Sequence, residues 1–182
     1  MLLTALAMGQ GGKLGRWQTP NGEAVNPLQP KKGQIGVVIF TMSDCPIANA
    51  YAPEINRIVA KYTAQGVAFS VVYVDSDLSK KAAKQHAQDY GYKCTQVLDP
   101  LHTLAQLAGA TTSPEAIVIG AKGTIVYRGR IDNRVAKYGK TRPNPTRQDL
   151  RITLDALLSG KPVPVARTPC VVCLISAPPS QK

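Results

Sequence analysis

The first half of the chain alternates apolar runs with an amphipathic stretch, and this pattern restricts the fold most. Residues 34–41 and 67–75 are short runs dominated by apolar side chains, as expected for strands that are buried on both faces of a sheet. Between them, apolar residues recur at helical spacing over residues 50–65, and Gly66 follows as a helix terminator. A strand, a helix and a second strand in this order predict a parallel sheet.

The rest of the chain extends this alternation and then adds a hairpin. The turn Gly120-Ala121-Lys122-Gly123 separates two β-rich segments, 115–119 and 124–130. We therefore predict an α/β fold whose central mixed sheet combines parallel strands with a C-terminal antiparallel hairpin, flanked by helices on both faces. The remaining expected elements are helices over residues 79–90, 101–107 and 146–158 and a short strand over residues 95–98.

Composition indicates one domain with two extended ends. The chain has 182 residues, of which 44% are hydrophobic, enough for a full core. We divide it into an extended lead-in over residues 1–33, a folded domain over residues 34–160 and a proline-rich tail over residues 161–182. The apolar first residues fit the remnant of an export signal or, equally, a disordered apolar terminus. An extracytoplasmic or periplasmic location is favoured, and a cytoplasmic one stays open.

Charge and hydropathy argue against nucleic-acid binding and against a membrane-spanning protein. The net charge is +11, but the basic residues are scattered and aromatic residues make up only 5% of the chain. Nucleic-acid binders usually concentrate basic and aromatic side chains on one face, so no nucleic acid is expected as a partner. No apolar run approaches the roughly 18 residues that a membrane-spanning helix needs, so the protein is not expected to span a membrane.

Cys45 is the strongest candidate for chemistry. It lies in a polar turn between the first buried strand and the following helix. The free N–H groups and the positive end of the dipole at a helix N-terminus stabilise an anion. They therefore favour the thiolate, which is the reactive form of cysteine. The alternative is a structural cysteine that packs as a small hydrophobic residue.

Three segments carry a resemblance to a known family. They are residues 40–46 (Phe-Thr-Met-Ser-Asp-Cys-Pro), residues 112–115 (Thr-Ser-Pro-Glu) and residues 127–132 (Tyr-Arg-Gly-Arg-Ile-Asp). In this order the chain resembles the thioredoxin-like superfamily, in its redoxin or alkyl hydroperoxide reductase/thiol-specific antioxidant branch, over residues 34–160. The resemblance implies that Pro114 follows a cis peptide bond in a loop that faces Cys45.

The active-site turn departs from the family pattern in two ways. Thioredoxins carry Cys-x-x-Cys, but Ala48 stands at the second cysteine position. The turn therefore has no second thiol that could release a mixed disulfide formed at Cys45. Peroxiredoxins carry a threonine three residues before the reactive cysteine, whereas Thr41 lies four residues before Cys45. Arg128 is a weak candidate for stabilising a thiolate or a peroxide oxygen, and the alternative places it on the solvent face of its strand.

The tail offers a second pair of thiols. Cys170 and Cys173 form Cys-Val-Val-Cys in the proline-rich segment. They are candidates to resolve a bond at Cys45, to form a local disulfide or to remain idle. Two thiolates alone make an incomplete metal site. The sequence after Cys173 resembles the end of related redoxin chains, which favours it over Cys170 as the resolving thiol, and Cys94 is expected to be buried.

These features predict a thiol-dependent oxidoreductase with antioxidant or redox-homeostasis activity. Its single active-site cysteine, Cys45, attacks a disulfide or a peroxide, and a tail thiol or an external thiol resolves the product. The expected partners are a thiol or disulfide protein or a peroxide, together with an external thiol reductant, and no cofactor or metal is expected. The alternative is a non-catalytic thioredoxin-fold module that binds partners or handles copper or zinc. A copper site would pair Cys45 with His102, but Asn49 replaces the second cysteine of such sites, and His86 is expected on a solvated face.

Overall fold

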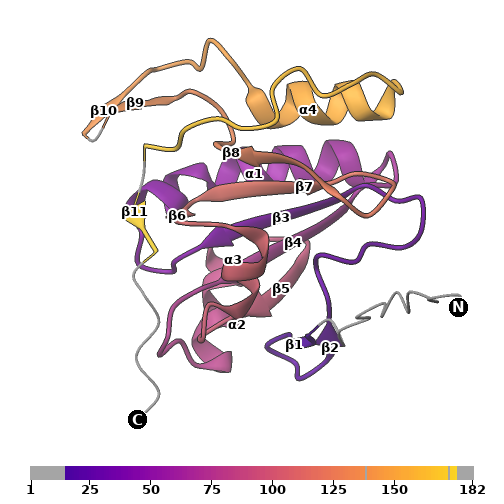
Figure 1. Ribbon diagram of the computed structural model, residues 1–182. Coiled ribbons are helices and arrows are strands. Elements are labelled where there is room, and N and C mark those ends of the chain that lie inside the picture. The colour runs from indigo at the N-terminus through magenta and orange to yellow at the C-terminus, as the bar shows by residue number, and fades with distance from the viewer. Residues whose placement is uncertain (1–14, 138, 172, 176–182) are drawn as a thin grey trace, which may run out of the picture.

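The computed structural model describes residues 15–137, 139–171 and 173–175 (Figure 1). Within these residues, one mixed sheet of seven strands forms the centre of the molecule, in the order β2-β1-β5-β4-β3-β7-β8. The α/β class and the mixed sheet predicted from the sequence are therefore confirmed. Its strands are β1 (Trp17–Gln18), β2 (Ala24–Val25), β3 (Gly36–Thr41), β4 (Ala68–Tyr73), β5 (Thr95–Leu98), β7 (Glu115–Ile119) and β8 (Ile125–Gly129).

Parallel pairing is confined to the middle of the sheet. Strand β4 runs parallel to β3 on one side and to β5 on the other. Strand β7 pairs antiparallel with β3 and then with β8, which gives the C-terminal hairpin. The lead-in also contributes, because β1 pairs antiparallel with both β5 and β2 at the edge of the sheet.

Helices cover both faces of this sheet, as predicted. The bounds of the described helices are α1 (Pro46–Thr63), α2 (Lys80–Asp89), α3 (Thr103–Ala108) and α4 (Asp149–Leu158). Alternate residues of β3 point to opposite faces, as in any strand. Val37 and Ile39 join the core under α1, α2 and α4, whereas Val38 and Phe40 join the core under α3 and Trp17. The near-continuous apolar run of this strand is thus explained by burial on both faces.

One helix start agrees with the sequence expectation and one differs from it. Helix α1 begins at Pro46, directly after Cys45, because Cys45 caps it and proline suits the first helical position. Helix α4 begins at Asp149 instead of following a cap at Thr146. The hydroxyl of Thr146 accepts a hydrogen bond from Asn133, and the Asp149 carboxylate forms ion pairs with two arginines, so the expected capping box does not form.

The chain returns to the body of the domain after α4. A short strand, β11 (Cys173–Leu174), pairs antiparallel with β6 (Thr112–Ser113), and Figure 1 shows the two side by side beyond the end of the main sheet. A second small sheet joins β9 (Val135–Lys137) to β10 (Lys140–Thr141). Among the described helices, none combines the length and apolar character that crossing a bilayer requires.

Candidate redox site

Cys45 lies at the junction between β3 and α1, where it is the N-cap residue of the helix. Its backbone is extended, and its sulfur accepts a hydrogen bond from the backbone N–H of Ala48 at 3.4 Å. Pro46 occupies the first turn, which costs nothing there because that N–H has no partner within a helix. The Cys45 side chain is only 2% exposed. The sulfur is therefore buried at the positive end of an 18-residue helix.

The loop that contains Pro114 faces this sulfur. The Ser113–Pro114 peptide bond is cis, and the carbonyl oxygen of Ser113 lies 3.4 Å from the Cys45 sulfur. The Ser113 hydroxyl accepts a hydrogen bond from the backbone N–H of Met42 at 2.9 Å. The loop is thus fastened to the turn that carries Cys45.

The tail brings a second cysteine to the same place. Cys173 forms a disulfide with Cys45, with 6.6 Å between their Cα atoms and a sequence separation of 128. Strand β11 holds it there, because Cys173 pairs with Ser113 and the Ile175 N–H donates to the carbonyl oxygen of Thr111. The structure therefore brings Cys45, Pro114 and Cys173 together.

The other two cysteines are free thiols outside this disulfide. Cys170 is half-buried, and burial raises the pKa of its thiol to about 11. Cys94 packs against the larger core, and burial raises its pKa to about 12. Both thiols are therefore protonated and weakly nucleophilic at neutral pH.

Arg128 and His102 are engaged away from the cysteine pair. The Arg128 guanidinium donates to the carbonyl oxygen of Gly109 at 2.7 Å, at the C-terminal end of α3. The His102 ring donates from Nε2 to the carbonyl oxygen of Val74 at 2.6 Å. Neither side chain has a hydrogen bond to Cys45 among the contacts of the described residues.

A polar network that was not predicted from the sequence surrounds the turn before Cys45. The backbone N–H and the hydroxyl of Ser43 both donate to the Asp75 carboxylate, at 2.9 and 2.6 Å for the nearer oxygen. The Asn49 amide donates to the carbonyl oxygen of Ser43 at 2.9 Å. His86 joins Asn49 to Tyr73, with 3.0 Å from His86 Nε2 to Asn49 Oδ1 and 3.0 Å from Nδ1 to the Tyr73 hydroxyl.

His86 is therefore half-buried in this network, and its expected place on a solvated face is wrong. Burial lowers the pKa of the imidazole below its ordinary value. The neutral ring accepts from Tyr73 at Nδ1 and donates from Nε2 to Asn49, which satisfies both nitrogens. The apolar positions of α2 do not reveal this arrangement, because it depends on α1 and β4 packing beside the helix.

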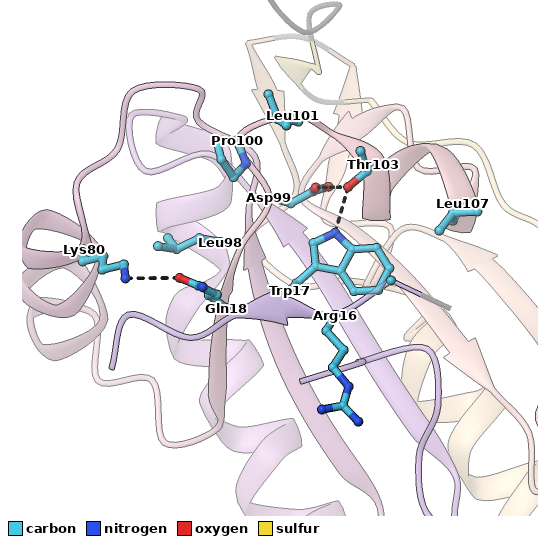
Figure 2. Close-up of a pocket in the computed structure, with 11 residues that line it drawn as sticks. Arg16, Trp17, Gln18, Lys80, Leu98, Asp99, Pro100, Leu101, Thr103 and Leu107 are labelled. Carbon is cyan, nitrogen blue, oxygen red and sulfur yellow. Dashed lines mark hydrogen bonds between the residues drawn. The ribbon is translucent and has the colours of Figure 1, made fainter. Parts of the chain in front are cut away.

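An apolar hollow lies elsewhere, between β1, the end of β5 and α3. It has a volume of about 570 Å³ and is lined mainly by apolar groups of Trp17, Leu98, Leu101 and Leu107. Figure 2 shows the Trp17 indole N–H bonded to the Thr103 hydroxyl at its wall. None of the cysteines lines this hollow, so it is separate from the redox pair. Among the described residues, no group of three or more His, Cys, Asp and Glu side chains is arranged to hold a metal ion.

Comparison with known proteins assigns the family. The family described as Redoxin matches residues 17–141, well over half of the chain. The chain therefore belongs to the Redoxin family, and its fold is thioredoxin-like, as the resemblance implied. The match begins at Trp17, so it includes the β1–β2 edge that was predicted as a lead-in. A comparison with curated proteins yields no match.

Several solved structures share this fold. An uncharacterized conserved protein from Geobacillus kaustophilus is 25% identical with a TM-score of 0.78, covering 92% of this chain and 90% of that one. A hypothetical protein from Sinorhizobium meliloti is 22% identical with the same TM-score of 0.78, covering 89% and 90%. A secreted Mycobacterium tuberculosis disulfide oxidoreductase homologous to E. coli DsbE is 20% identical with a TM-score of 0.53, covering 80% and 92%.

Proposed function

We propose that this protein is a thiol–disulfide oxidoreductase in which Cys45 is the attacking thiol and Cys173 is the resolving thiol of the same chain. The observation that carries the proposal is the disulfide between these two residues, held against the loop of Pro114. Cys173 supplies from the tail the second sulfur that Ala48 cannot supply from the turn. As in the Cys-x-x-Cys proteins, a second thiol would release the mixed disulfide, but here that thiol comes from the tail.

The reduced protein would act in two exchange steps. The Cys45 thiolate attacks one sulfur of a substrate disulfide, forming a mixed disulfide and releasing the other substrate sulfur as a thiolate. The Cys173 thiolate then attacks the Cys45 sulfur, which releases the second substrate thiolate and leaves the Cys45–Cys173 disulfide. An external dithiol restores the reduced form by the same chemistry, so the electrons in each cycle come from that reductant.

The site favours a disulfide substrate over a peroxide. The Ala48 N–H and the start of α1 stabilise the Cys45 thiolate, which serves either substrate. However, the arginine considered for a peroxide oxygen, Arg128, is engaged at the end of α3. With a peroxide, Cys45 would become a sulfenic acid, and Cys173 would condense with it to the same disulfide with loss of water. An antioxidant activity, seen as consumption of peroxide, is therefore the second candidate function.

We also propose an extracytoplasmic location. A disulfide between two distant segments persists in oxidising compartments and is rare where glutathione keeps thiols reduced. One structural neighbour is named as a secreted disulfide oxidoreductase. Separation of host cells into periplasmic and cytoplasmic fractions, followed by immunoblotting for this protein, tests this location. Recovery of the protein in the cytoplasmic fraction alone would contradict it.

The test of function compares four purified proteins: the wild type and the variants Cys45→Ser, Cys173→Ser and Cys94→Ser. Each is assayed for reduction of insulin by dithiothreitol and, separately, for consumption of hydrogen peroxide. We expect Cys45→Ser to be inactive, Cys173→Ser to accumulate a mixed disulfide at Cys45, and Cys94→Ser to match the wild type. Retention of wild-type turnover by Cys45→Ser in both assays would overturn the proposal. The metal-handling alternative predicts instead stoichiometric Cu(I) or Zn(II) binding that requires Cys45 or the tail pair.

A further inference from the structure

We propose that Asn49 and His86 are positioning residues for the Cys45 thiol. This inference rests on the proposed function, since it assigns two more residues to the same site. Neither side chain contacts the sulfur. They act through the backbone of Ser43, two residues before Cys45.

Asn49 connects the start of α1 to the turn that precedes it. Its side-chain amide donates to the carbonyl oxygen of Ser43 at 2.9 Å, while its backbone N–H donates to the carbonyl oxygen of Cys45 at 3.0 Å. The residue therefore contacts the turn on both sides of Asp44. Its half-buried side chain occupies a position one helical turn after Cys45, on the same face of the helix.

His86 sets the orientation of the Asn49 amide. A hydrogen bond of 3.0 Å joins its Nε2 to the Asn49 oxygen, which leaves the amide nitrogen directed to Ser43. The Tyr73 hydroxyl, 3.0 Å from Nδ1, fixes the ring, and Tyr90 packs on it with 4.4 Å between the ring centroids. Without the His86 donor, the amide would be free to turn.

The other side of the turn is fastened independently. Asp75 accepts from the N–H of Ser43 at 2.9 Å, and the Ser113 hydroxyl accepts from the N–H of Met42 at 2.9 Å. The Asn49 amide supplies the side-chain hydrogen bond of 2.9 Å to the Ser43 carbonyl oxygen, and the His86 imidazole also interacts with the backbone of Ser43. Loss of the Asn49 donor would weaken the support of the turn on this face.

The consequence for chemistry follows from the position of the sulfur. The hydrogen bond from the Ala48 N–H, 3.4 Å long, is one of the groups that would stabilise the Cys45 thiolate at the start of α1. A turn that shifts by a few tenths of an ångström weakens this contact. The thiol pKa then rises, and its reactivity at neutral pH falls.

The experiment measures alkylation of Cys45 in the reduced full-length protein with iodoacetamide as a function of pH, followed at the peptide level by mass spectrometry. It compares Asn49→Ala with Asn56→Ala. Asn56 is a matched control, because it is half-buried in the same helix and its amide also donates to a backbone carbonyl, that of Tyr90, at 2.8 Å. We expect Asn49→Ala to slow alkylation at neutral pH about tenfold and to move the midpoint up by about one pH unit, with Asn56→Ala unchanged.

A second pair of variants tests the role of His86. This pair also keeps the inference testable if the Asn49→Ala variant does not fold. His86→Gln keeps an N–H donor for Asn49 and is expected to give a profile close to the wild type, whereas His86→Leu removes the donor and is expected to shift the midpoint upward. Equal profiles for the Gln and Leu variants, or for the two asparagine variants, would overturn the inference. Alkylation requires no turnover, so this result is independent of whether Cys45→Ser abolishes disulfide reduction.

Discussion

Cys173 is bonded to Cys45 across 128 positions of sequence, and the Cα atoms of the two residues lie 6.6 Å apart. Pairing of β11 with β6 holds the tail in this position, with Cys173 opposite Ser113. The disulfide therefore ties the last described strand to the start of α1, and several expectations follow from its geometry.

An external thiol should attack Cys173 rather than Cys45 in the oxidised protein. Cys45 is 2% exposed, whereas Cys173 is half-buried at the surface of β11. The stabilised Cys45 thiolate is also the better leaving group. After brief exposure to glutathione and an acid quench, mass spectrometry should find glutathione on Cys173 and a free thiol at Cys45. Glutathione mainly on Cys45 would contradict this order of attack.

Loss of the disulfide should lower the stability of the folded domain. A closed loop of this length restricts the unfolded chain, which is worth about 2 to 5 kcal/mol in the chain-entropy description. Urea unfolding of the wild type, with and without dithiothreitol, measures the difference. The Cys94→Ser variant is the control, because that thiol is outside the disulfide and should leave the effect of reduction unchanged.

Glu54 should make the protein sensitive to acid. Burial raises the pKa of its carboxyl, but the hydrogen bonds from Arg151 at 2.8 Å and from Arg57 outweigh burial and hold the pKa below its ordinary value. A depressed pKa contributes stability that is complete above the unfolded value, about 4.5, and is lost as the pH falls through the folded value. In Glu54→Gln, the free energy of unfolding should therefore depend less steeply on pH below about 4.5 than in the wild type. Equal pH slopes for the two proteins in urea titrations would rule this contribution out.

Arg128 should matter for stability and not for thiol chemistry. Its guanidinium donates to the carbonyl oxygen of Gly109, where α3 ends in a left-handed conformation with φ of 68°. Arg128→Met removes this charge-assisted hydrogen bond and should cost about 1 to 3 kcal/mol. Turnover per folded molecule should stay at the wild-type level. A large loss of turnover at unchanged stability would return Arg128 to the active site.

Tyr51 should stabilise the packing of α1 against the segment after β8. Its hydroxyl donates to the Asp132 carboxylate at 2.7 Å inside the protein, where both side chains are buried. Tyr51→Phe leaves that carboxylate oxygen without this donor and should lower the free energy of unfolding by about 1 to 3 kcal/mol. Thermal unfolding followed by circular dichroism is the measurement. Tyr90→Phe, at an exposed site, serves as the comparison.

The sequence was sufficient wherever structure depends on neighbours along the chain. The near-continuous apolar runs predicted β3 and β4, and the helical spacing of apolar residues between them predicted α1. These three elements also placed Cys45 between a strand and a helix. Such runs predict a sheet that is buried on both faces, because the side chains of each strand enter the apolar cores on both sides of the sheet. The place of Cys45 at a helix start is a local property for the same reason.

Only the tertiary structure decided the partners of that cysteine. Cys170 and Cys173 lie three residues apart in the same proline-rich tail, and a resemblance of the segment after Cys173 to other redoxin chains favoured Cys173 without placing it next to Cys45. Cys173 reaches Cys45 because β11 pairs with β6 in a register that places Cys173 opposite Ser113. The contacts of Asn49 with His86 likewise join α1 to α2, and Arg128 turns to the end of α3. Periodicity reports which face of an element is buried, whereas long-range packing determines which side chains meet.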